Sequence, residues 1–74
     1  NSEVGISFSL PEGAEMDLSI YDINGRRVST VISEQLPAGD YTMRWNPGDT
    51  PSGTYFARLV TPAGESGAKL LYVK

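Results

Sequence analysis

The chain has 74 residues, a length that suits one small domain. Six basic and nine acidic side chains give a net charge of −3, which argues against binding to nucleic acid or to an anionic membrane surface. Cysteine and histidine are both absent, which excludes disulfides, thiolate or imidazole metal sites, and catalytic arrangements that need either residue. We therefore expect no cofactor and no catalytic activity. We also expect no membrane insertion, because no apolar run approaches the roughly 20 residues of a membrane span.

Apolar and polar residues alternate along the first half of the chain, a period that is typical of β-strands. This pattern predicts strands over residues 4–10, 16–20 and 28–32. The second and third strands are separated by Asn24-Gly25, for which we predict a type I′ hairpin turn with positive φ at both residues. Val31 is out of phase with the alternation in its strand, which predicts a β-bulge or a bend.

The second half continues the same pattern, with strands predicted over residues 41–45, 55–60 and 68–73. Trp45 is in phase with Tyr41 and Met43, so we expect its ring to lie between two sheets. The segment 46–52 is rich in Pro, Gly and Asp and predicts an irregular loop. No helical stripe and no internal repeat is evident. Six strands, or seven if the first is split, predict an all-β, immunoglobulin-like antiparallel β-sandwich that forms a single domain over residues 1–74.

Clusters of residues that could carry chemistry are few. The carboxylates of Glu12, Glu15 and Asp17 have no neighbour that would raise a pKa, so we interpret them as a solvated surface. The segment 22–25 begins like a calcium-binding loop, but the remaining ligands do not follow at the required spacing. A weak calcium site in loops, formed by Asp40, Asp49 and Glu65, stays open as an alternative.

Aromatic residues outside the predicted core could bind a sugar, because an exposed ring can stack on a pyranose. Tyr21, Phe56 and Tyr72 are the candidates for an exposed aromatic stripe. A scattered exposed aromatic is ordinary on a small protein, so the stripe by itself does not establish this function. A carbohydrate-binding module is therefore kept as an alternative.

Several short motifs follow one another along the chain in a characteristic order. They are residues 6–12 (ISFSLPE), 18–26 (LSIYDINGR), 36–41 (LPAGDY), Trp45, 52–56 (SGTYF) and the end of the chain from Lys69. Their order and spacing resemble the C-terminal sorting domain of type IX secretion cargo, and equally the immunoglobulin-like domain of the flagellar hook-capping protein. The resemblance covers nearly the whole chain. The Asn-Pro-rich start of such families is absent, and only Asn1 could remain of it.

The resemblance implies a non-catalytic module at the C-terminus of a larger bacterial protein that is secreted or held at the cell surface. Its partners would be the neighbouring upstream domain and the outer-membrane type IX secretion machinery. Recognition by that machinery would fall on Gly25, Arg26, Gly53, Tyr55, Lys69 and Lys74. The main alternative is a structural accessory or spacer domain of a secreted hydrolytic enzyme, and the position of the domain in its parent protein would distinguish the two.

Overall fold

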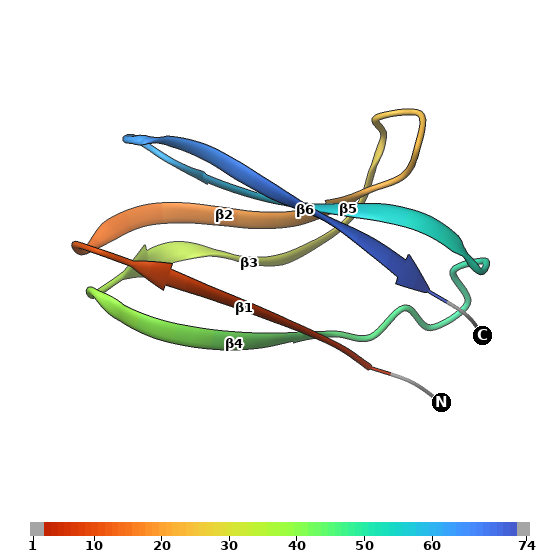
Figure 1. Cartoon of the computed structure of the whole chain (residues 1–74), viewed down its shortest axis with the longest axis horizontal. Helices are drawn as coiled ribbons and strands as arrows, with labels where there is room; N and C mark the ends of the chain where they lie inside the picture. Colours follow the sequence, from red (N-terminus) through yellow and green to blue (C-terminus); the bar gives the residue numbers. More distant parts are fainter. Residues whose placement is uncertain (1–2, 73–74) are drawn as a thin grey trace.

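Six antiparallel strands make up nearly all of the computed structural model, which describes residues 3–72 (Figure 1). The strands are β1 (Val4–Leu10), β2 (Ala14–Tyr21), β3 (Arg27–Leu36), β4 (Gly39–Trp45), β5 (Gly53–Thr61) and β6 (Gly64–Tyr72). Each overlaps a strand predicted from the alternation of apolar residues, but β3 extends four residues past its predicted end and β6 begins four residues before its predicted start. No helix occurs within the described residues, so none there is long and apolar enough to cross a membrane.

The strands form two sheets of unequal size. β1 and β4 pair as a two-stranded sheet, and the other sheet has four strands in the order β3-β2-β5-β6. After the β2–β3 hairpin the chain crosses to the smaller sheet as β4 and then returns as β5, which pairs with β2. The two sheets face each other across the core (Figure 1). The predicted immunoglobulin-like β-sandwich is thereby confirmed.

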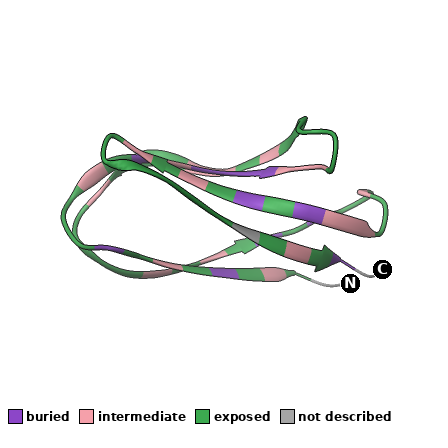
Figure 2. Cartoon of the chain, turned by 45° about the horizontal axis from the view of Figure 1, so that its top comes forward, coloured by how far each residue is buried: buried purple, intermediate pink, exposed green. Residues whose placement is uncertain are grey.

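The core largely follows the period of two, so that more and less buried positions alternate along most of the ribbons (Figure 2). The exception in β2 is Ser19, which is buried between Leu18 and Ile20. Trp45 is only 3% exposed, which confirms its predicted burial between the sheets. Its ring lies edge-on to Tyr55, with 5.6 Å between the centroids, and 6.2 Å from Tyr72. The other buried apolar residues are Ile6, Leu10, Met16, Leu18, Ile20 and Ala57.

The irregularity predicted at Val31 is a β-bulge. Leu18 of β2 is opposite Ile32 and the next residue, Ser19, is opposite Thr30, so Val31 is the extra residue on β3. A second shift of register follows Ile20. The bulge explains why Val31 and Ile32 are both partly buried although they are adjacent.

The β2–β3 loop differs from the predicted type I′ turn. Gly25 has φ = 82°, but no residue other than glycine has positive φ within residues 3–72, so the prediction was wrong for Asn24. The carbonyl of Asp22 accepts the Gly25 N–H at 3.0 Å, and the Asp22 N–H donates to the Arg26 carbonyl at 2.9 Å. This is a three-residue loop in which a turn is followed by a left-handed glycine.

Candidate recognition surface

Two exposed residues predicted for recognition, Arg26 and Lys69, belong to the half of the four-stranded sheet that carries the β2–β3 hairpin. In the cross-strand register Tyr21 is opposite Phe56, which is opposite Lys69. The hairpin loop directly follows Tyr21, so it projects from the end of the sheet where β5 begins and β6 ends (Figure 1). The side chains of Arg26 and Lys69 are both exposed. Lys74 lies outside the described residues.

The conformation of the hairpin loop is held by the carboxylate of Asp22. Its Oδ1 accepts the backbone N–H of Asn24 at 2.9 Å and that of Arg26 at 3.0 Å, and its Oδ2 lies 3.2 Å from Arg26 Nε. The backbone N–H of Arg26 is the main cause that lowers the pKa of Asp22, and the Asn24 N–H and the Arg26 guanidinium add to it. These donors also explain why the loop does not adopt the type I′ conformation. The Arg26 side chain remains 77% exposed.

The same hydrogen bonds bear on the calcium alternatives. The oxygens that would begin a calcium loop in segment 22–25 already accept three N–H groups. Asp40, Asp49 and Glu65 do not come together, and no group of three or more metal-ligating side chains is found within the described residues. The structure therefore provides no assembled carboxylate site for a cation in residues 3–72.

Tyr55 and Gly53 have structural roles. Tyr55 is 7% exposed, and its hydroxyl donates to the carbonyl of Pro51 at 2.6 Å. The ring folds back over Gly53, where an added Cβ would lie 3.9 Å from it. This arrangement is a tyrosine corner, in which a tyrosine fixes the backbone that leads into its own strand. A buried Tyr55 is not available for direct contact with a partner.

The corner occurs twice, which the sequence analysis missed. Tyr41 donates to the carbonyl of Pro37, also at 2.6 Å, and its ring folds over Gly39 in the same way. The two segments, Pro37-Ala38-Gly39-Asp40-Tyr41 and Pro51-Ser52-Gly53-Thr54-Tyr55, share the pattern Pro-x-Gly-x-Tyr. This pattern, which begins β4 and β5, was the signal that could have revealed a short internal repeat.

Basic and aromatic side chains share the outer face of the sheet next to the hairpin. The guanidinium of Arg58 lies 4.6 Å from the centre of the Tyr21 ring, and that of Arg27 lies 5.9 Å from it. Arg27 also donates to the Tyr21 hydroxyl at 3.4 Å, an interaction that raises the pKa of Arg27. Phe56 is 40% exposed beside this group. Sequence reasoning did not single out Arg58, because its proximity to Tyr21 depends on the cross-strand register.

The predicted aromatic stripe is incomplete. Tyr72 is 6% exposed and packs near Trp45, so its prediction as an exposed ring was wrong. Tyr21 and Phe56 do lie side by side on the outer face. Arg58 lies over the Tyr21 ring, and a sugar stacking there would have to displace the guanidinium. The geometry therefore gives the carbohydrate alternative little support.

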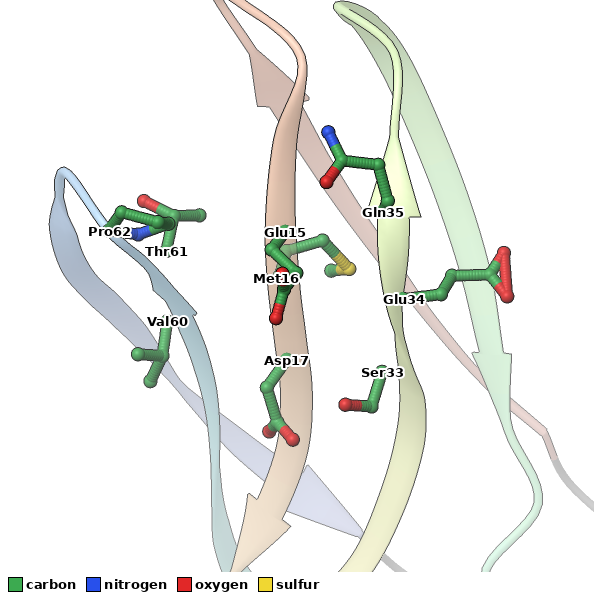
Figure 3. Close-up of a pocket in the computed structure, with 9 residues that line it drawn as sticks. All are labelled: Glu15, Met16, Asp17, Ser33, Glu34, Gln35, Val60, Thr61 and Pro62. Carbon is green, nitrogen blue, oxygen red and sulfur yellow. The ribbon is translucent and has the colours of Figure 1, made fainter.

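The far end of the same face is acidic. Glu15 and Asp17 of β2 border an open hollow of about 610 Å³ between β3 and β5, together with Ser33, Gln35 and Val60 (Figure 3). Glu34 also borders it, but its carboxylate points away from the other side chains (Figure 3). Glu15 is exposed, as expected for a solvated surface, whereas Asp17 is half-buried and accepts the hydroxyl of the buried Ser19 at 2.6 Å. The outer face is thus basic near the hairpin and acidic at its other end.

Two packed antiparallel sheets around an aromatic core define an immunoglobulin-like β-sandwich domain. The family model of the FlgD Ig-like domain matches residues 1–64, and the chain belongs to this family. The family consists of non-catalytic structural domains. No curated protein and no solved structure matches the chain. The resemblance to the flagellar hook-capping domain is thereby confirmed, whereas the resemblance to type IX sorting domains stays a prediction.

Proposed function

We propose that the domain is a sorting module at the C-terminus of a larger secreted or cell-surface protein, recognised by the outer-membrane type IX secretion machinery. The observation that carries the proposal is that Arg26 and Lys69 are both exposed in the half of the four-stranded sheet that carries the β2–β3 hairpin. This arrangement offers a receptor two exposed cations on one region of the surface. FlgD-like domains belong to extracellular flagellar components, which supports a location outside the cell.

The scaffold suits a recognition role because it fixes the backbone positions from which both cations project. Asp22 orients Arg26 through a charge-assisted hydrogen bond, and Gly25 provides the backbone conformation that lets the loop close. Lys69 lies on a strand whose position is set by pairing with β5. In this proposal Gly25, Gly53 and Tyr55 support the surface, whereas Arg26 and Lys69 contact the partner. Lys74 is retained as a candidate contact.

The proposal is tested by export of a fusion. Residues 1–74 are fused to the C-terminus of a periplasmic reporter in a bacterium with a type IX system, and secreted and periplasmic reporter are measured. The intact fusion should leave the cell. The combined Arg26→Ala and Lys69→Ala variant should lower export roughly tenfold, the effect of losing about 1.4 kcal/mol of binding free energy. Adding Lys74→Ala should lower it further.

The matched control is Arg44→Ala, which removes an exposed cation from β4 in the other sheet and should leave export unchanged. All variants should melt cooperatively at the temperature of the parent domain. Unchanged export of the folded double variant would remove Arg26 and Lys69 from the signal. Retention of the intact fusion in the periplasm would contradict the sorting role and favour a structural spacer.

A further inference from the structure

The β2–β3 loop stands out from the outer face of the larger sheet. In Figure 1 it rises from the end of β2, on the side away from β1 and β4. Two of its side chains are widely exposed, Ile23 at 70% and Arg26 at 77%. The loop therefore presents an apolar side chain and a cation together, on a backbone whose conformation Asp22 stabilises.

The opposite end of the same face carries a hollow of matching character. This is the hollow of about 610 Å³ between β3 and β5, which is bordered by the carboxylates of Glu15 and Asp17 (Figure 3). Val60 and Pro62 supply apolar groups at its side. None of the described residues that border it is basic. A cation that entered with an apolar side chain would find both kinds of partner there.

The loop and the hollow lie on opposite sides of the middle of β2. Glu15 and Asp17 precede Ser19 along the strand and the loop follows it, and at about 3.4 Å per residue each lies within roughly 15 Å of Ser19. A two-fold axis that crosses the strands at Ser19, in the plane of the outer face, turns a second copy end for end. Each loop then meets the hollow of the other copy, as the symmetry of a closed dimer requires.

The same rotation also matches the other side chains of the face. Phe56 is opposite Lys69 in the cross-strand register, and farther along β5, beyond Arg58, Val60 is opposite Glu65. The rotation sets Phe56 against Val60 of the second copy, which is an apolar contact. It sets Lys69 against Glu65 of the second copy, which pairs opposite charges. A two-fold axis along the strands would instead set the basic end on itself, so charge selects the end-for-end arrangement.

The two Arg58 side chains are the like charges that this arrangement brings near the axis. Each lies 3.6 Å from the carboxylate of Glu65 and 4.6 Å from the centre of the Tyr21 ring in its own copy, and both contacts offset its charge. Gly67, which is opposite Arg58, has no side chain, and an open hollow of about 450 Å³ lies there. The hollow gives the two guanidinium groups room to lie apart.

We infer that the domain forms a weak two-fold dimer in which the β2–β3 loop of each copy enters the acidic hollow of the other. Four strands spaced about 4.8 Å apart offer roughly 400–500 Å² of outer face per copy. This area is below that of stable interfaces, so the dimer is reversible and weakens at high salt. The inference goes beyond the proposed function and does not rest on it. The dimer covers Arg26 and Lys69, so a receptor for these cations binds the monomer.

Sedimentation equilibrium of purified residues 1–74, between about 10 µM and about 1 mM, measures the association. The parent domain should dimerise within this range. Lys69→Glu opposes Glu65 and should weaken dimerisation at least about tenfold, whereas Arg44→Glu makes the same charge change on the other sheet and should not.

Glu15→Lys tests the contact between the loop and the hollow. It replaces an anion of the hollow by a cation and should also weaken dimerisation at least about tenfold. Glu34→Lys is the matched control, because the Glu34 carboxylate points away from the other side chains of the hollow (Figure 3). It should weaken dimerisation by less than about twofold. Equal effects of the two variants would show that net charge is the cause and would overturn the inference.

A charge swap tests the end-for-end arrangement itself. The double variant Lys69→Glu with Glu65→Lys restores opposite charges across the interface and should bring dimerisation back to within about threefold of the parent domain. A double variant that dimerises as weakly as Lys69→Glu alone would contradict the arrangement. Amide spectra of each variant show whether it is folded.

A parent domain that stays monomeric at the highest concentration would overturn the inference. Amide shifts that change on dilution should fall on the β2–β3 loop, β5 and β6. Shifts confined to β1 would place the contact at the smaller sheet and would also overturn it. These measurements use purified protein without a receptor, so a failure of the export experiment leaves them unaffected.

Discussion

The aromatic cluster of Trp45, Tyr55 and Tyr72 and the hairpin loop of residues 22–26 both belong to the end of the sandwich where β5 begins and β6 ends, but they are stabilised differently. The cluster residues are 7% exposed or less, and their rings contact one another across the two sheets. The loop is held by hydrogen bonds to one carboxylate, and its Arg26 side chain is 77% exposed. Burial therefore dominates the first region, and local hydrogen bonding the second.

This difference separates residues that the family resemblance had grouped together. Tyr55 belongs to the cluster, and its substitution would disturb the fold before it disturbed recognition. Arg26 belongs to the loop, where a side chain can be removed without opening the core. A loss of export in a Tyr55 variant would therefore not identify a contact residue. The following predictions test how far the two regions differ.

The largest effect is expected for Trp45→Ala. Removing a buried indole that contacts two tyrosines should lower the free energy of unfolding by about 3–5 kcal/mol. That loss is comparable to the whole stability of a domain of this size. Denaturant titration followed by circular dichroism measures it. A Trp45→Ala variant that melts cooperatively near the temperature of the parent domain would contradict the assignment of Trp45 to the core.

A smaller effect is expected for Gly25→Val in the loop. Gly25 has φ = 82°, and a β-branched residue there should cost about 1–2 kcal/mol of strain although nothing lies within 4 Å of an added Cβ. Gly5→Val is the matched control, because an added Cβ there also meets nothing within 4 Å and its φ is not positive. Equal destabilisation of the two variants would show that backbone conformation is not the cause.

The two tyrosine corners allow a finer comparison. Tyr55→Phe leaves the Pro51 carbonyl without its partner in a partly buried place and should cost about 1–2 kcal/mol. Tyr41→Phe removes the equivalent bond where solvent reaches it and should cost less than about 0.5 kcal/mol. Chemical denaturation of both variants measures the difference. A larger loss of unfolding free energy for Tyr41→Phe than for Tyr55→Phe would contradict the proposed dependence on burial.

The smallest effect concerns pH and the loop. Because folding lowers the pKa of Asp22 below its ordinary value of 3.8, its contribution to stability is present above about pH 4 and is lost as the pH falls through the lowered value. At neutral pH the Asp22→Asn variant should therefore melt at a lower temperature than the parent domain. This difference in melting temperature should disappear in acid, where Asp22 is protonated in the parent domain. Melting temperatures of both proteins measured between pH 2 and 7 test this prediction. A difference that stays constant with pH would exclude the charge of Asp22 as its cause.

The local pattern of the sequence was sufficient to predict the strands, the burial of Trp45 and the bulge at Val31. Each of these depends on the side-chain alternation of one strand, which the sequence displays directly. Gly25 was also predicted correctly, because a hairpin loop needs a residue that tolerates positive φ. The conformation of Asn24 was not predicted, since it depends on how the Asp22 carboxylate is used by neighbouring N–H groups.

Tertiary structure alone decided which face of the last strand is buried. Leu70 and Tyr72 alternate with Leu71, so β6 is apolar on both sides and its sequence pattern does not select a face. The position of Trp45 in the opposing sheet places Tyr72 inside, and Leu71 is left 74% exposed. The contact between Arg58 and Tyr21 likewise depends on the pairing of β5 with β2, residues far apart in the chain. Burial along one strand follows from local chemistry, whereas contacts between strands follow from register, which no single segment encodes.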